Sequence, residues 1–171
     1  MVSDDFELAY KDFYPVLIRV AYRITGSTEV SEDLCQEAFV RYYERMDKIP
    51  PGEQAKYWMI RVVKNLAYNH EKRKGRERNA YQKHYHEPKP EVINQGEKGL
   101  MEDESKKLIQ EALMKLPYKM RVVLTLKEYA NLNYKQIGEI LKISEGNVKI
   151  RVFRARQKLS EILDKGEVYV P

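Results

Sequence analysis

The sequence contains a single cysteine, Cys35, so no disulfide can form within the chain. A lone cysteine is most often a reduced and buried thiol. No stretch approaches the roughly 18 uninterrupted apolar residues that a membrane-spanning helix needs. The N-terminus is acidic and has neither the basic nor the apolar segment of a secretory signal peptide. These absences together predict a cytoplasmic protein.

Patterns that would indicate catalysis are also missing. The sequence has no glycine-rich phosphate-binding loop and no cysteine or histidine pairs at metal-ligand spacing. The cluster His84-Tyr85-His86 stands alone in a polar segment, where we expect solvated side chains rather than a metal. The acids and histidines form no recognisable catalytic set. We therefore expect a protein that is not an enzyme and that uses neither a cofactor nor a metal.

Charge is abundant and unevenly distributed along the chain. Of the 171 residues, 33% are charged and 43% are hydrophobic, and the net charge is +5. Residues 1–70 contain nine basic and eleven acidic side chains, residues 71–99 contain eight and five, and residues 100–171 contain fourteen and ten. The positive charge therefore lies in the middle and C-terminal parts. This distribution suits a polyanionic partner, although solvated helices are often basic too.

The spacing of apolar residues predicts an all-α protein, because it follows the helical period and nowhere alternates as in a strand. We expect helices over residues 6–24, 29–46, 55–74, 101–116 and 121–129, followed by two more. Residues 75–99 contain glycines, prolines and many charges but few large aliphatic side chains, which predicts a flexible linker. The sequence therefore predicts two small helical domains, residues 1–74 and 100–171, joined by the linker 75–99.

The last two helices have the pattern of a helix-turn-helix. Asn133 followed by Gln136 three residues later forms a capping-box pattern at the start of a short helix. That helix should end near Lys142, and after a tight turn Ser144 should cap a longer helix. Gly138 is small at the point where the two helices should approach closely. A short helix, a tight turn and a longer basic helix are typical of DNA-binding domains.

The longer helix has one apolar and one mixed face. At 100° per residue, the core stripe consists of Val148, Val152, Ala155, Leu159 and Ile162. The opposite face consists of Ile150, Phe153, Arg154 and Gln157, flanked by Lys149, Arg151, Arg156 and Lys158. In a major groove, the basic side chains can bind phosphates and base acceptors, and the apolar ones can meet a thymine methyl group. An amphipathic helix with merely solvated charges is the alternative.

The helix that spans residues 56–74 has aromatic rings and cations on one face. Its core stripe consists of Met59, Val62, Val63, Leu66 and His70, and its opposite stripe of Tyr57, Arg61, Lys64 and Tyr68, with Asn65 at the edge. Trp58 lies at the boundary between core and surface. Bases can stack on such rings while cations follow the backbone, which suits single-stranded DNA. Tyrosines that only cover the edge of the core are an equally good interpretation of this helix alone.

The helix that spans residues 29–46 is acidic on its outer side. Its buried stripe consists of Leu34, Ala38, Phe39, Tyr42 and Met46, and its far side of Asp33, Gln36, Glu37, Val40 and Glu44. DNA would repel this face, so a protein partner with a basic surface is its natural ligand. An ordinary solvated acidic surface is the alternative.

Several segments, in this order, resemble bacterial RNA polymerase sigma factors of the sigma-70 family. Residues 33–39 resemble the polymerase-binding motif of region 2, and residues 58–67 its promoter-melting and minus-10 helix. Residues 116–117, 121–124 and 134–138 resemble the start of region 4. Residues 146–156 resemble the minus-35 recognition helix of region 4. With a short linker and no region 1.1 or region 3, the chain resembles the extracytoplasmic-function (ECF, group IV) class over roughly residues 6–74 and 100–165.

This resemblance implies a transcription initiation factor that binds core RNA polymerase and directs it to promoters through minus-10 and minus-35 elements. It implies that the core polymerase contacts Asp33, Gln36, Glu37, Val40 and Glu44. It implies that the melted minus-10 strand contacts Lys56, Tyr57, Trp58, Arg61, Lys64, Asn65 and Tyr68, together with the loop before Trp58. It implies that the minus-35 duplex contacts Ser144, Asn147, Lys149, Ile150, Arg151, Phe153, Arg154, Arg156 and Gln157. An anti-sigma factor is a further partner that such proteins often have.

The chain departs from the family pattern within the helix-turn-helix. The family usually has Glu-Ile-Ala where this chain has Gln136-Ile137-Gly138, and threonine and often serine where it has Asn147 and Ile150. Because Ile150 cannot hydrogen-bond a base, the promoter sequence does not follow from the resemblance. Two other functions remain open at this point. One is a stand-alone helix-turn-helix regulator that does not bind core polymerase, and the other is a module that docks on polymerase without initiating.

Overall fold

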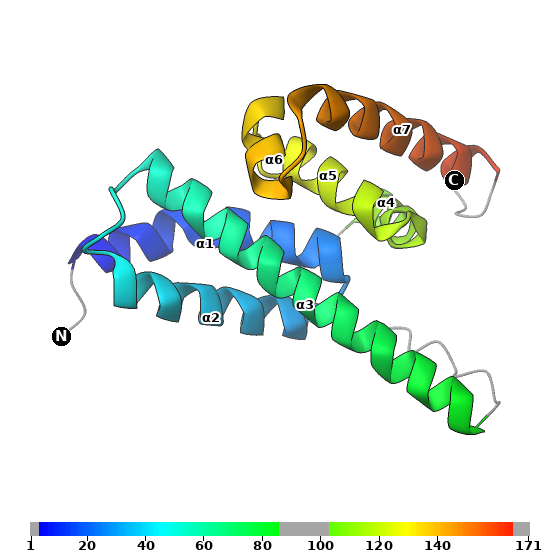
Figure 1. Ribbon diagram of the computed structural model, residues 1–171, viewed down its shortest axis with the longest axis horizontal. Coiled ribbons are helices and arrows are strands. Elements are labelled where there is room, and N and C mark those ends of the chain that lie inside the picture. The colour runs from blue at the N-terminus through cyan, green and yellow to red at the C-terminus, as the bar shows by residue number, and fades with distance from the viewer. Residues whose placement is uncertain (1–3, 86–102, 166–171) are drawn as a thin grey trace.

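The computed structural model describes residues 4–85 and 103–165 and contains only helices in these ranges (Figure 1). The helices are α1 (Asp4–Thr25), α2 (Thr28–Arg45), α3 (Glu53–Tyr85), α4 (Glu104–Lys115), α5 (Tyr118–Glu128), α6 (Tyr134–Leu141) and α7 (Glu145–Asp164). The predicted all-α fold is confirmed. No helix among these combines the length and apolar character needed to cross a membrane.

Helices α1, α2 and α3 pack on one another as a bundle (Figure 1). Gly26 ends α1 with a φ of +72°, a left-handed conformation that favours glycine. The chain then turns sharply, and the Ser27 hydroxyl caps α2 by accepting a hydrogen bond from the Val30 N–H at 3.2 Å. Leu17 and Met59 are fully buried between the helices. The turn at Gly26 and the cap at Ser27 therefore reverse the chain so that α2 packs against α1.

Helix α3 is longer than the sequence predicted. Its expected end was Lys74, but the helix continues to Tyr85, so the first eleven residues of the predicted linker are helical. Gly75 lies inside the helix and costs only about 1 kcal/mol relative to alanine. The neighbouring arginines, lysines and glutamates are good helix formers, and the first proline after them is Pro88. The remainder of the predicted linker, residues 86–99, lies outside the described residues. The other expected helices are present, with ends that differ by three residues or fewer.

Helices α5, α6 and α7 form the helix-turn-helix domain, with α4 packed against α7. The capping box predicted at the start of α6 is present. The Gln136 N–H donates to Asn133 Oδ1 at 2.8 Å, and the Asn133 N–H donates to Gln136 Oε1 at 3.0 Å. Lys142 ends α6 in the left-handed conformation, with a φ of 58°. At Gly138 an added Cβ would lie 2.7 Å from the Ile143 carbonyl oxygen. The predicted close approach of α6 to the start of α7 is therefore confirmed.

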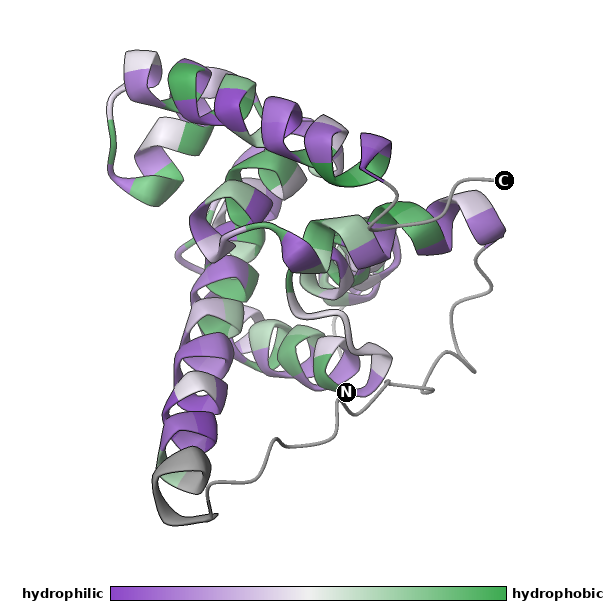
Figure 2. Ribbon diagram, turned by 90° about the vertical axis from the view of Figure 1, so that its right-hand side faces the viewer, coloured by the Kyte–Doolittle hydropathy of each residue, from purple (hydrophilic) through white to green (hydrophobic). Residues whose placement is uncertain are grey.

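The two helical groups pack directly on each other, which the sequence did not predict. Helix α1 contacts both α4 and α5, and Met114 of α4 lies against Gly26 at the end of α1. Figure 2 shows apolar ribbon segments concentrated where helices face one another and hydrophilic segments on the outer sides. Helices α2 and α7 lie on opposite sides of the molecule (Figure 1). The acidic and basic surfaces predicted on these two helices are thereby kept apart.

Candidate nucleic-acid interface

The outward face of α7 presents two large apolar side chains to solvent. Ile150 is 50% exposed and Phe153 is 69% exposed, while Val148 and Val152 on the other side of the helix are buried. Arg154 is also exposed beside Phe153. The predicted division of α7 into a core stripe and an opposite mixed face is confirmed. Such a face, with apolar and cationic groups together, has the chemistry that a DNA major groove requires.

The remaining predicted duplex-binding residues of α7 differ in how free they are to reach DNA. Ser144 caps the helix, because its hydroxyl accepts a hydrogen bond from the Asn147 N–H at 3.1 Å. Arg151 is half-buried. Arg156 forms an ion pair with Glu128 of α5, and this hydrogen bond raises the pKa of the Arg156 guanidinium. Asn147, Lys149 and Gln157 are exposed. Lys149 lies 5.9 Å from the centre of the Tyr134 ring. Ser144, Arg156 and Lys149 therefore already have partners in the free protein.

A cleft opens at the N-terminal end of α3, beside the predicted strand-binding residues. Its volume is about 510 Å³, and Tyr57, Trp58 and Arg61 form one wall. The loop before α3 contributes a second side through residues 48–50. Aromatic rings, a cation and a hollow of this size fit an unstacked base. The loop before Trp58, which the resemblance assigned to the minus-10 strand, therefore forms part of the cleft.

The third side of the cleft comes from the other domain. Gln136 and Glu139 of α6 line it, and the Tyr57 hydroxyl lies 3.2 Å from the Gln136 carbonyl oxygen and 3.1 Å from Glu139 Oε2. Burial and the hydrogen bond to Glu139 raise the pKa of Tyr57. Sequence reasoning assigned no role to Glu139, and no local pattern could have identified it, because its contact is 82 residues away in the chain.

Farther along α3, the predicted cations and rings also contact each other and the second domain. The Lys64 ammonium lies 5.8 Å from the centre of the Tyr68 ring and donates to Asn65 Oδ1 at 3.4 Å. Partial burial lowers the pKa of Lys64, and the positive charge of Lys142 on the second domain lowers it further. The Tyr68 ring lies 5.9 Å from that of Tyr118 on α5. The structure thus brings these side chains together on one stripe but leaves only part of the stripe open.

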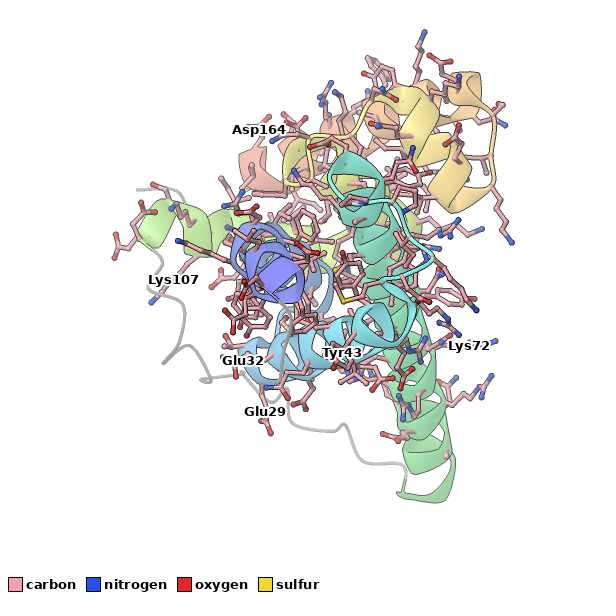
Figure 3. All side chains as sticks on the ribbon, turned by 90° about the vertical axis from the view of Figure 1, so that its left-hand side faces the viewer. Glu29, Glu32, Tyr43, Lys72, Lys107 and Asp164 are labelled. Carbon is pink, nitrogen blue, oxygen red and sulfur yellow. The ribbon has the colours of Figure 1, made fainter. Side chains whose placement is uncertain are left out.

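The predicted acidic face of α2 is exposed at every position. The residues concerned are Asp33, Gln36, Glu37, Val40 and Glu44. Glu37 forms an ion pair with Arg41 one turn later, at 3.0 Å, between two half-exposed side chains. In Figure 3 the neighbouring Glu29 and Glu32 lie at the edge of the molecule away from the helix-turn-helix domain. A partner can therefore reach this face without disturbing the core.

Cys35 lies on the opposite side of α2 and is fully buried. Burial raises the pKa of its thiol to about 12, so the predicted buried thiol is confirmed. Within the described residues, no three His, Cys, Asp or Glu side chains gather as a metal site would require. The side chains of the His84–His86 cluster lie outside the part of the chain described at that level.

Two family models match the chain in the order that the sequence predicted. The model described as Sigma-70 region 2 matches residues 9–77, and the model described as Sigma-70, region 4 matches residues 106–159. The first match contains the acidic face and the sides of the cleft that α3 and its preceding loop form. The second contains the helix-turn-helix, including the residues of α6 that line the cleft. Both models describe parts of the same family of transcription factors.

Relatives show the same likeness over nearly the whole chain. The ECF RNA polymerase sigma factor SigW of Bacillus subtilis is 29% identical over 167 residues, which cover 90% of this chain and 84% of that protein. The ECF RNA polymerase sigma factor SigE of Mycolicibacterium smegmatis is 33% identical over 153 residues, which cover 86% of this chain and 57% of that protein. A solved structure of the sigma factor RpoE with the anti-sigma factor NepR from Bartonella quintana has a similar fold. Its TM-score is 0.75 at 22% identity, covering 95% of this chain and 98% of that one. The chain therefore belongs to the sigma-70 family as an ECF-class sigma factor, a transcription initiation factor that directs RNA polymerase to promoters.

Proposed function

We propose that the chain binds a promoter at two sites, the minus-10 and minus-35 elements, while the acidic face of α2 binds core RNA polymerase. The observation that carries this proposal is the outward face of α7, where Ile150 and Phe153 are exposed beside cations on the second helix of a helix-turn-helix. Ile150 and Phe153 lie about one helical turn apart, and exposed apolar side chains that adjoin one another mark interaction sites more often than scattered ones do. The face fits a duplex major groove, where thymine methyl groups can meet Ile150 and Phe153 and base acceptors can meet Lys149 and Arg154.

The cleft at the start of α3 is the proposed site for the melted minus-10 strand. Trp58 and Tyr57 supply rings for stacking, and Arg61 supplies a positive charge for the phosphates. An extruded base loses its stacking in the duplex, and a cleft of about 510 Å³ with aromatic walls offsets part of that loss. The residues farther along α3, Lys64, Asn65 and Tyr68, would guide the strand away from the cleft.

The acidic face of α2 is the proposed contact with the polymerase core. Asp33, Glu37 and Glu44 give it a negative charge, and Val40, with 54% of its surface exposed, gives it an apolar centre. Charged rims around an apolar contact favour fast and specific association. The bounds of the two family matches support a division into two domains. The N-terminal domain ends within α3, and the C-terminal domain begins near α4.

We further propose that the chain works in the cytoplasm, has no catalytic activity of its own, and is controlled by an anti-sigma factor. Two neighbours of similar fold were solved with such partners, RpoE with NepR and CnrH with the cytosolic domain of CnrY. The three surfaces described above are the ones that an inhibitor would need to cover, because each faces a component of the transcription complex.

Reconstituted transcription tests the proposal. Core polymerase with this chain should initiate at defined start sites on genomic DNA fragments, whereas core polymerase alone should not. The mapped promoters would also reveal which bases α7 reads. Gel filtration of the chain with core polymerase is the companion measurement. If the chain binds duplex DNA but neither elutes with the core nor supports initiation, the proposal is refuted.

A further inference from the structure

The last part of α3 extends beyond the bundle that it forms with α1 and α2. Figure 1 shows this end of the helix continuing past both neighbours and away from the helix-turn-helix domain. Residues 72–74 and 76–80 are all exposed. An added Cβ at Gly75, between them, would meet no other part of the protein within 4 Å. Within the described part of the chain, nothing therefore covers this end of the helix.

This segment, residues 72–80, is the cationic end of α3. It contains one acid, Glu77, and has a net charge of +4, and its five cations are Lys72, Arg73, Lys74, Arg76 and Arg78. The ion pairs found among the described residues include none of these five. Lys72 and Arg76 are like charges one helical turn apart, and so are Lys74 and Arg78, which destabilises a helix. A polyanion bound here would offset that repulsion.

The cationic end continues the face of α3 proposed above for the minus-10 strand. At 100° per residue, Lys72, Arg76 and Asn79 lie on the same side of the helix as Arg61 and Tyr68. The Lys72 ammonium lies 6.0 Å from the centre of the Tyr68 ring. In Figure 3, Lys72 lies at the edge of the molecule, on the side of α3 turned away from α1 and α2. The two segments therefore form one continuous surface.

The chemistry of this surface changes along the helix axis. Its first part contains Tyr57, Trp58 and Tyr68, rings on which unpaired bases can stack. Residues 69–80 contain no phenylalanine, tyrosine or tryptophan. Cations without such rings bind phosphates, which suits DNA whose bases remain paired. At 1.5 Å per residue, Arg76 lies about 27 Å beyond Trp58 along the axis, so several unpaired nucleotides fit between the cleft and the cationic end.

On the basis of the minus-10 site proposed above, we infer that the cationic end of α3 binds the phosphates of the duplex that adjoins the melted strand. Lys72 and Arg76 contact this backbone from the face shared with Tyr68. The other three cations add positive charge from the sides of the helix. Contacts of this kind fix the position of the DNA and carry no sequence information.

The test uses the complex of core polymerase with the full-length chain and two fluorescein-labelled DNAs. One is a fork, in which the minus-10 strand of a mapped promoter overhangs a duplex arm of about one helical turn, roughly 10 base pairs, without a minus-35 element. The other is the overhanging strand alone. The double variant Lys72→Ala with Arg76→Ala removes two cations from the proposed contact. Its matched control, Lys11→Ala with Arg19→Ala, removes the same charges from exposed positions on α1.

We expect the first double variant to bind the fork about fivefold more weakly than the wild type, as for two exposed charge contacts. The dependence of log K on log salt should become shallower by about 1.8, because two phosphate contacts are lost. The control should match the wild type on both DNAs. On the single strand, the first double variant should match the wild type too.

A second pair of variants adds charge instead of removing it. Asn79→Lys places a cation on the proposed face, and Ser105→Lys places one at an exposed position on α4. Only Asn79→Lys should bind the fork more tightly, by about twofold, with a slope steeper by about 0.9. Because a failure to fold does not raise affinity, this pair decides the inference if the first double variant loses helix content in circular dichroism.

Three results would overturn the inference. Equal losses on the fork and on the single strand would mean that the cations bind the melted strand. Unchanged fork binding in the first double variant and in Asn79→Lys would mean that the cations are only solvated. Loss of co-elution with the core in gel filtration would identify an acidic protein surface as the partner. The minus-10 assignment itself fails by a different result, in which neither Tyr57→Ala nor Arg61→Ala weakens binding of the single strand, and the inference then falls with it.

Discussion

Replacing Phe153 by alanine tests whether the outward face of α7 binds DNA without contributing to the stability of the fold. A phenylalanine side chain presents roughly 150–250 Å² of surface, of which 69% is exposed here. At about 25 cal/mol per Å², complete burial of at least about 100 Å² would contribute about 2.5 kcal/mol. A groove covers roughly half of that area, so we expect Phe153→Ala to weaken minus-35 binding by about 1–1.5 kcal/mol, close to tenfold in Kd.

The assay is fluorescence anisotropy with a duplex taken from a mapped promoter, at several salt concentrations. Phe153→Ala should lower the affinity equally at all salt concentrations, because no phosphate contact is lost. The free energy of unfolding should change by less than about 0.5 kcal/mol, as for other exposed positions. By contrast, Val152→Ala on the buried side should destabilise the domain by about 1–3 kcal/mol.

Arg154→Ala is the electrostatic control. If Arg154 binds a base, its loss should cost about 1–3 kcal/mol and relax specificity at one position. If it binds only a phosphate, the salt dependence should instead become shallower, by about 0.9 in the logarithmic slope.

An affinity of Phe153→Ala equal to that of the wild type would refute the groove assignment of this face, and so would a loss of stability equal to that of Val152→Ala.

The other predictions concern the acidic face, the cap and the buried thiol. Glu37→Lys should abolish co-elution with core polymerase in gel filtration and leave duplex binding intact, because Glu37 is exposed; normal core affinity would contradict the assignment of α2. Asn133→Ala removes the side chain that caps α6 and should lower the free energy of unfolding in urea by about 1 kcal/mol, whereas no change would mean that the cap is dispensable. The pKa of Cys35 is raised from 9.0 to about 12 by burial, so its contribution to stability is complete below pH 9. That contribution is lost as the pH rises toward 12, by about 1.4 kcal/mol per pH unit. Urea unfolding at pH 8, 9 and 10 should show a shallower decline in Cys35→Ala, and identical declines would contradict this cause.

Local features of the fold could be predicted because their causes are local. The capping box at Asn133 and the cap at Ser144 depend on residues three positions apart. The core stripe of α7 follows from the helical period alone, and the observed burial of Val148 and Val152 agrees with it. The predicted end of α3 at Lys74 is wrong, because the polar and charged composition of the following residues does not prevent a helix. Charged residues without large aliphatic side chains can still form a helix where no proline interrupts it.

The candidate site could be predicted only in part. The faces of α2 and α7 were placed correctly, since each is a property of one helix. The predicted core stripe of α3 was wrong in part, because Ile60 and Ala67 are fully buried and Tyr57 and Lys64 on its predicted outer face are half-buried. The cleft was not predicted, because it needs the loop at Pro50 and Glu139 of α6 together with α3. The ion pair between Arg156 and Glu128 was not predicted either, because Glu128 lies on a different helix.

The sequence by itself determined which residues form helices, which side of each helix is apolar, and which family the chain resembles. Those properties arise from neighbours a few positions apart, where the helical period and the caps act. Only the tertiary structure decided which of the outward faces remain open. Arg23 and Gln110 are 87 residues apart in the chain, and Tyr57 and Gln136 are 79 apart. Contacts between such distant residues depend on how two finished surfaces fit, and no local pattern in the sequence encodes that fit.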